Sequence, residues 1–87
     1  MKIKVYYNKN LKMTDGKLAA QCSHAVAGLV SSVGYTMNTT IVILEAREKK
    51  FLELWDSIEK NKYMQVDLGF TEVEAGTKTA FAYVEEW

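Results

Sequence analysis

The chain has 87 residues, of which 48% are hydrophobic and 25% charged, and its 11 basic and 11 acidic side chains give a net charge of zero. This length predicts one domain over residues 1–87, and with no net charge any polyanionic partner must be met by a local patch. A single cysteine excludes a disulfide framework and favours a reducing, cytoplasmic compartment, and no apolar run is long enough for a membrane span or a signal peptide.

The first half of the chain predicts a strand, a helix and a second strand. Residues 2–7 alternate between apolar and polar side chains, as a strand does. Residues 14–33 have helical spacing, and Gly34 follows them at a position where helices often end in glycine. Residues 39–46 contain the unbroken apolar run 41–44, which predicts a strand that is covered on both faces.

The second half predicts a helix over residues 48–60, a short strand over 63–67, a loop over 68–76 and a last strand over 77–85. Two strand–helix–strand units imply parallel neighbouring strands with right-handed crossovers. The last connection is too short for a helix, so the last strand is predicted to be antiparallel. We therefore expect an α/β fold with a mixed sheet, in which ligands bind beyond the carboxyl ends of the parallel strands.

Projecting residues 17–33 onto a helix separates two faces. Opposite the core face lies a narrow polar line of Lys17, Gln21, His24 and Gly28, spaced four, three and four residues apart. Its neighbours are small and only one of its side chains is charged, so we predict that another group, from a ligand or from the protein, approaches this face closely. The core face itself is apolar and consists of Leu18, Cys22, Ala25, Val26, Leu29 and Val33.

Lys17 belongs to the first turn of this helix, where backbone N–H groups have no intrahelical partner. A lysine beside free amides is typical of an anion or oxyanion site, and a tolerated surface lysine is the alternative. His24 is either a ligand-facing base or a structural histidine. Cys22 is interpreted as a small buried hydrophobe, and a chain with one histidine and one cysteine offers no cluster with metal-ligand spacing.

The loop before the last strand carries a second group of polar residues. Asp67 ends the third predicted strand, with hydroxyl side chains nearby and with glycines that permit positive φ. Ordinary turn chemistry is the alternative interpretation of this group. Because this loop and the lysine-bearing helix start are expected at one end of the sheet, we predict that they form one site. The nearby residues are Gly69, Thr71, Gly76, Thr77 and Thr79.

Residues 12–25 read Lys-Met-Thr-Asp-Gly-Lys-Leu-Ala-Ala-Gln-Cys-Ser-His-Ala and resemble the signature of type II peptidyl-tRNA hydrolases, the archaeal and eukaryotic class. The pattern Asp67-x-Gly69-x-Thr71 followed by Gly76-Thr77-x-Thr79 is similar to the second motif of that family. Two motifs in the right order are far more specific than either alone.

The resemblance implies a three-layer α/β/α fold around a four-stranded mixed sheet, and cleavage of the ester between a peptide and the terminal ribose of tRNA without metal or cofactor. We hypothesise that activated water attacks this ester. Lys17 with the first-turn amides would hold either the developing oxyanion or a phosphate of the tRNA end, and either Asp67 or His24 would act on water. The expected catalytic residues are Lys17, His24, Asp67, Thr71 and Thr77. The expected substrate-binding residues are Gly16, Gln21, Gly69, Gly76 and Thr79.

The sequence departs from the family pattern in several places. It stops at Trp87 without the family's C-terminal helix, has Ala75 in place of a proline, has a short connection after its first helix and carries no net charge. A homodimer is expected to cover the part of the sheet that the helix would cover. The alternatives to a hydrolase of this ester are a catalytically inactive module that binds an RNA end or nucleotide, a hydrolase of small esters, and a purely structural dimer.

Overall fold

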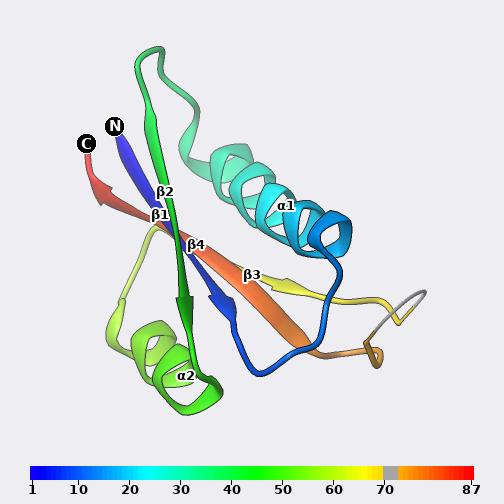
Figure 1. Ribbon diagram of the computed structural model, residues 1–87. Helices are drawn as coiled ribbons and strands as arrows, with labels where there is room; N and C mark the ends of the chain where they lie inside the picture. The colour runs from blue at the N-terminus through cyan, green and yellow to red at the C-terminus, as the bar shows by residue number, and fades with distance from the viewer. Residues whose placement is uncertain (70–72) are drawn as a thin grey trace.

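The computed structural model describes residues 1–69 and 73–87. Its elements follow the predicted order of strands and helices (Figure 1). The second helix is three residues shorter than predicted, and each strand boundary differs from the prediction by no more than one residue. The elements are β1 (Lys2–Asn8), α1 (Asp15–Val33), β2 (Thr40–Ala46), α2 (Glu48–Ser57), β3 (Lys62–Val66) and β4 (Lys78–Glu86).

The four strands form one mixed sheet in the order β2-β1-β4-β3. β1 and β2 are parallel, whereas β4 is antiparallel to both β1 and β3, which confirms the predicted direction of the last strand. The expectation that β2 and β3 would be neighbours is wrong, because β1 and β4 lie between them. β1, β2 and β3 all end at the same edge of the sheet, where β4 begins.

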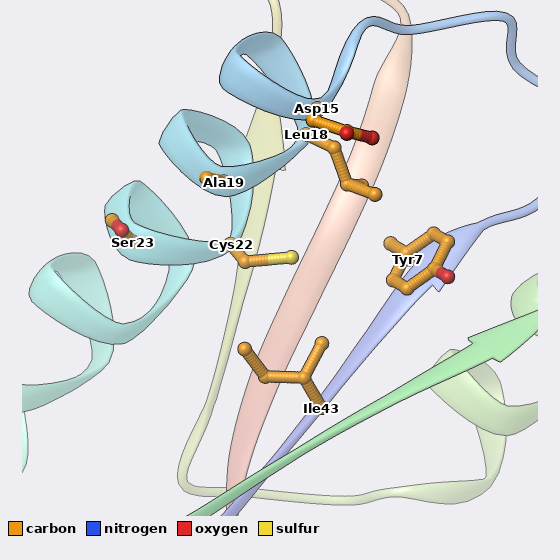
Figure 2. Close-up of a pocket in the computed structure, with 7 residues that line it drawn as sticks. All are labelled: Tyr7, Asp15, Leu18, Ala19, Cys22, Ser23 and Ile43. Carbon is orange, nitrogen blue, oxygen red and sulfur yellow. The ribbon is translucent and has the colours of Figure 1, made fainter.

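β2 is an edge strand, and the prediction that both of its faces are covered is wrong. Ile41 and Ile43 are 42% and 53% exposed. The reason is the position of α1, which packs on β1, β3 and β4. A pocket of about 320 Å³ therefore separates Ile43 from residues of α1 such as Leu18 and Cys22 (Figure 2). An apolar run identifies a strand, but it does not distinguish a central strand from an edge strand.

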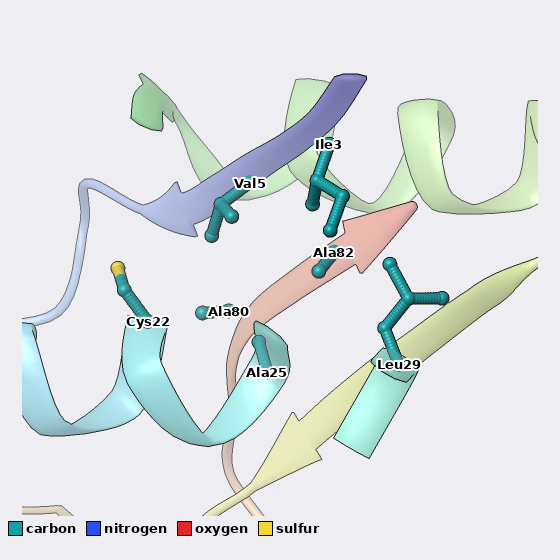
Figure 3. Close-up of a cluster of buried hydrophobic side chains, with 7 residues drawn as sticks. All are labelled: Ile3, Val5, Cys22, Ala25, Leu29, Ala80 and Ala82. Atoms are coloured by element: carbon teal, nitrogen blue, oxygen red, sulfur yellow. The ribbon is translucent and has the colours of Figure 1, made fainter. Parts of the chain in front are cut away.

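The two helices lie on opposite sides of the sheet, which makes the fold a three-layer α/β/α arrangement (Figure 1). Figure 3 shows the core under α1, where helix residues Cys22, Ala25 and Leu29 meet the buried face of β1 and β4. On the other side, Phe51 of α2 packs against Phe81 of β4, with ring centroids 5.1 Å apart. Both cores are made by the helical spacing and strand alternation of the sequence.

Local sequence fixes both ends of α1. Thr14 is the N-cap, and its hydroxyl oxygen accepts the N–H of Lys17 at 3.4 Å. Gly34, at φ 84°, ends the helix, and its N–H donates to the carbonyl of Val30 at 2.9 Å. The N-cap follows the loop after β1, so the first turn of α1 lies at the edge where the parallel strands end. That position brings Lys17 close to the end of β3.

Candidate active site

A pocket of about 330 Å³ lies between α1 and the end of β3. Three polar residues of the helix line, Lys17, Gln21 and His24, contribute to it together with Asp67 from the loop after β3. The two groups of residues that the sequence singled out separately are therefore parts of one cavity. The complete lining is Lys17, Ala20, Gln21, His24, Gln65, Asp67 and Leu68.

The central interaction of the pocket is an ion pair between the Lys17 Nζ and Asp67 Oδ1. Both side chains are almost buried, at 11% and 5% exposed. The second carboxylate oxygen of Asp67 accepts the N–H of Gly69 at 2.7 Å. The hydrogen bond from Lys17 and, after it, the amide of Gly69 lower the pKa of Asp67, and together they outweigh burial, which acts in the opposite direction. Asp67 is therefore ionised at neutral pH.

The backbone of the loop holds Asp67 from both sides. Its N–H donates to the carbonyl of Thr77 at 2.9 Å, and its carbonyl accepts the N–H of Gly76 at 2.8 Å. Gly69 has φ 83°, and a Cβ added to it would lie 2.8 Å from Ala75, so a glycine is required there. Thus Thr77 and both glycines that the sequence indicated surround Asp67, through their backbone groups.

Gln21 and Thr79 form a buried polar pair behind the ion pair. Gln21 is 4% exposed and Thr79 is fully buried. The Thr79 hydroxyl donates to Gln21 Oε1 at 2.6 Å and also lies 3.2 Å from the carbonyl of Gln65. Because a hydroxyl has one proton, these acceptors compete for it, and the shorter contact is to Gln21. The pair connects α1 to β4 at the inner wall of the pocket.

Of the remaining predicted site residues, one lines the pocket and one does not. His24 is exposed and lines the pocket. Gly16 is exposed in the first turn of α1 and does not line the pocket. Thr71 lies outside the described residues.

From its spacing, we expected the polar line to lie opposite the core face of α1, and this expectation is wrong. At Gly28 the line is instead occupied by protein, because the Tyr63 ring of β3 lies so close that an added Cβ would be 2.3 Å from it. Gln21 is buried against Thr79. Since β3 and β4 pack beside this line, it forms the side of α1 that faces them. Projecting a sequence onto a helix shows which residues share a face, but it does not show which strands pack against that face.

Three residues of the pocket were not predicted from the sequence, namely Ala20, Gln65 and Leu68. A signal was available for Gln65, because it precedes Asp67 by two residues and side chains two apart point to the same side of a strand. At the expected anion site, the backbone N–H of Lys17 donates to Thr14 and the Lys17 ammonium is paired with Asp67.

Cys22 is a buried free thiol whose pKa is raised by burial, as expected of a core residue that is not a nucleophile. Within residues 1–69 and 73–87 there is no group of three or more His, Cys, Asp and Glu side chains that could hold a metal ion. No helix among these residues is long and apolar enough to cross a membrane. The chemistry available in the pocket is that of an ammonium group, a fixed carboxylate and an exposed imidazole.

Comparison with known proteins gives two matches. The family model described as peptidyl-tRNA hydrolase PTH2 matches residues 1–84, which include both the polar line of α1 and the loop that follows β3. A protein named peptidyl-tRNA hydrolase from Haloquadratum walsbyi (strain DSM 16790 / HBSQ001) is 32% identical over an alignment 93 positions long, which covers 94% of this chain and 83% of that protein.

Proposed function

The chain belongs to the peptidyl-tRNA hydrolase PTH2 family, and on that premise we propose that it cleaves the ester between a peptide and the terminal ribose of tRNA in the pocket of Lys17, His24 and Asp67. The observation that carries the assignment of the site is the almost buried Lys17–Asp67 ion pair. It places a fixed ammonium group in the wall of a pocket that also contains an exposed imidazole.

Ester hydrolysis needs stabilisation of the oxyanion that forms when water attacks the carbonyl carbon. In our proposal the Lys17 ammonium supplies it, and Asp67 holds that ammonium in position. Asp67 has a lowered pKa, and a carboxylate that accepts protons poorly is a weak general base. We therefore assign Asp67 to positioning Lys17 and assign removal of the proton from water to His24, which is exposed in the same pocket.

The other expected residues complete the proposed site. The carbonyl of Thr77 accepts the backbone N–H of Asp67. We assign Thr77 and Thr71 to positioning water or the ribose. Gln21 and Thr79 support the inner wall through their buried hydrogen bond, and Gly69 and Gly76 shape the loop around Asp67. Gly16, in the open first turn of α1, is assigned to contact with the tRNA end.

Binding of tRNA to a chain without net charge requires local cations. Lys12 precedes α1 and Lys78 begins β4, so both lie in segments that flank the pocket, and both are exposed. We assign these lysines to contacts with tRNA phosphates. A cytoplasmic location fits a chain whose single cysteine is an unpaired thiol. A homodimer fits the exposed isoleucines of β2.

The direct test is release of the N-blocked amino acid from N-acetyl-aminoacyl-tRNA. Lys17→Ala is expected to reduce turnover by about 10²–10³-fold, the usual effect of removing one oxyanion donor, with an unchanged circular dichroism spectrum. Lys60→Ala, which removes an exposed lysine outside the pocket, is the matched control and should retain turnover. Wild-type turnover in Lys17→Ala would contradict the assignment.

Salt dependence separates tRNA from a small ester as substrate. Contacts with phosphates release counterions, so affinity for tRNA should fall steeply between about 50 mM and 200 mM salt. Hydrolysis of a small activated ester should respond little. A folded wild-type protein that binds tRNA but does not release the amino acid would indicate the inactive binding module instead.

A further inference from the structure

β3 is the second edge strand of the sheet, and it leads directly into the candidate active site (Figure 1). Among the described residues, β3 has β4 as its one strand neighbour. Gln65 lies in β3, Asp67 and Leu68 follow it, and all three line the pocket that contains the Lys17–Asp67 ion pair. An extended ligand along the outer edge of β3 therefore continues into this pocket.

Hydrogen bonds at the two ends of β3 show which of its backbone groups point outward. Before the strand, the carbonyl of Asn61 accepts the N–H of Val84 in β4 at 3.0 Å, and after the strand the N–H of Asp67 donates to the carbonyl of Thr77 at 2.9 Å. Backbone groups of alternate residues point to the same side of a strand, so the odd-numbered residues of 61–67 face β4. The irregularity in this pairing adds a residue to β4, so the alternation along β3 is continuous. The residues of β3 whose backbone groups point away from β4 are Lys62, Met64 and Val66.

The outer edge of β3 lacks the residues that usually protect an edge strand. β3 contains no proline, and its one lysine turns back toward α2. The Lys62 ammonium donates to the carbonyl of Trp55 at 2.7 Å and lies 3.8 Å from the centroid of the Trp55 ring. At the other end of β3, Gln65 Nε2 donates to the carbonyl of Val66 at 3.2 Å, so this outward carbonyl is accessible to a donor. The edge is therefore suited to pair with an extended chain.

We propose that the outer edge of β3 binds the peptide of the substrate as an added strand that runs parallel to β3; this inference rests on the hydrolase function proposed above. The direction follows from the chemistry, because the ester carbonyl belongs to the last residue of the peptide. That residue has to lie in the pocket beside Asp67, and the earlier residues then run back along β3 toward Lys62. The five residues of β3 have room for about four residues of the peptide.

Backbone pairing suits a substrate whose peptide varies in sequence. Main-chain hydrogen bonds supply affinity that does not depend on the side chains of the bound peptide, whereas selectivity comes from pockets for alternate side chains. Tyr63 and Val66 of β3 are 41% and 40% exposed and carry no charge that would select one peptide over another. The peptide is also attached to the group that the pocket holds, so its effective concentration at this edge is high.

The effect of peptide length tests the subsite with the wild-type protein. N-acetyl-alanyl-tRNA and N-acetyl-tetraalanyl-tRNA have the same reacting ester and differ in the residues that reach the edge of β3. One net backbone hydrogen bond contributes about two- to tenfold, so two such bonds should raise kcat/KM about 10-fold for the longer substrate. Equal kcat/KM for the two substrates would overturn the subsite. Failure to cleave either substrate would overturn the proposed hydrolase function instead.

N-methylation of the longer peptide tests whether it pairs as a strand. The second and third residues before the ester are methylated in turn, and one of these two N–H groups faces β3 while the other faces away. Methylation of the N–H that faces β3 should remove most of the gain from peptide length. Methylation of its neighbour is the matched control and should retain the gain, because both changes restrict the peptide backbone in the same way. Equal loss at both positions, or loss at neither, would overturn strand pairing.

A substitution in β3 assigns the pairing to this edge. Met64→Pro removes one outward N–H, and proline is tolerated in an edge strand where its nitrogen faces solvent. The ratio of kcat/KM for the longer substrate to that for the shorter one should fall by about two- to tenfold. Met64→Ala keeps the N–H and should retain the ratio. A Met64→Pro protein with a wild-type circular dichroism spectrum and a wild-type ratio would overturn the assignment, and a change in its molar mass alone would assign the edge to a second copy.

Discussion

The two sides of α1 differ in how their residues are used. On the side toward β3, Lys17 binds Asp67 and Gln21 binds Thr79. On the side toward β2, apolar residues such as Val26 and Val30 border an open groove next to Ile43. Both sides come from one uninterrupted helix, which contains no proline.

The comparison shows that buried polar groups indicate a fixed arrangement of side chains, whereas exposed apolar groups indicate a surface that the chain leaves open. In the described part of the chain, every buried side-chain nitrogen and oxygen has a hydrogen-bond partner. The polar side of α1 is therefore a fixed arrangement that is suited to position a reacting group. On the apolar side, Val26 and Val30 pack partly against the core and leave an open groove toward Ile43 of β2. The pocket of Lys17 and Asp67 and the apolar groove therefore lie on different sides of α1.

A large effect on turnover, second to that of Lys17→Ala, is expected from breaking the polar side at Asp67. Asp67→Asn removes the charge that holds the Lys17 ammonium, and loss of positioning should reduce turnover of N-acetyl-aminoacyl-tRNA by about 10²-fold. Asp56→Asn changes an exposed residue of α2 in the same way and should have no effect. Turnover by Asp67→Asn within twofold of wild type would show that the ion pair is not part of the catalytic arrangement.

A smaller effect is expected at the buried pair behind the site. Thr79→Val keeps the shape of the side chain but leaves Gln21 Oε1 without its donor, so the free energy of unfolding should fall by about 1–3 kcal/mol. Urea denaturation measures this change. Adding Gln21→Leu should restore much of the loss, because the double variant buries no unpaired oxygen. Simple additivity of the two losses would argue against the hydrogen bond as their cause.

Gly28 tests how tightly β3 packs against the helix. Gly28→Ala places a Cβ against the Tyr63 ring, and overpacking usually costs about 1–3 kcal/mol. Alanine regains about 1 kcal/mol of helix propensity, so the net loss should be small. In a Tyr63→Ala background the same substitution should stabilise the protein. Thermal melts of the four proteins separate the two contributions, and stabilisation by Gly28→Ala alone would mean that the ring moves away freely.

The pH dependence of stability tests whether Asp67 is ionised in the ion pair. The pKa of Asp67 is lower in the folded chain than in the unfolded chain, so its ion pair contributes to stability above the ordinary carboxyl pKa of about 3.9. The contribution is lost as the pH falls through the lower, folded pKa. The difference in urea midpoint between wild type and Asp67→Asn should therefore be constant from pH 7 to 5 and shrink below pH 4. A difference that already disappears at pH 5 would contradict the lowered pKa.

The sequence was sufficient to predict the elements and the site residues that local patterns determine. Thr14 and Gly34 mark the ends of α1, and the spacing of Lys17, Gln21 and His24 places them along one line. The two motifs that carried the family resemblance meet in the structure at Lys17 and Asp67.

Features that depend on tertiary neighbours could not be predicted in this way. The apolar run of β2 suggested a covered strand, but the insertion of β4 next to β1 leaves β2 at the edge. Gln21 lines the pocket, but its spacing along the chain did not indicate that it is also buried and accepts a hydrogen bond from Thr79 of β4. Spacing along a chain determines which residues share a side, and the strand order decides what that side meets.

The most direct test of the account is a double-mutant cycle on hydrolysis of N-acetyl-aminoacyl-tRNA, with wild type, Lys17→Ala, Asp67→Asn and the double variant. If the ion pair acts as one unit, each single variant loses turnover, and the double variant is about as slow as Lys17→Ala, because residues that act together are not additive. If the two losses multiply, or if either single variant turns over like wild type, Lys17 and Asp67 do not form one catalytic unit.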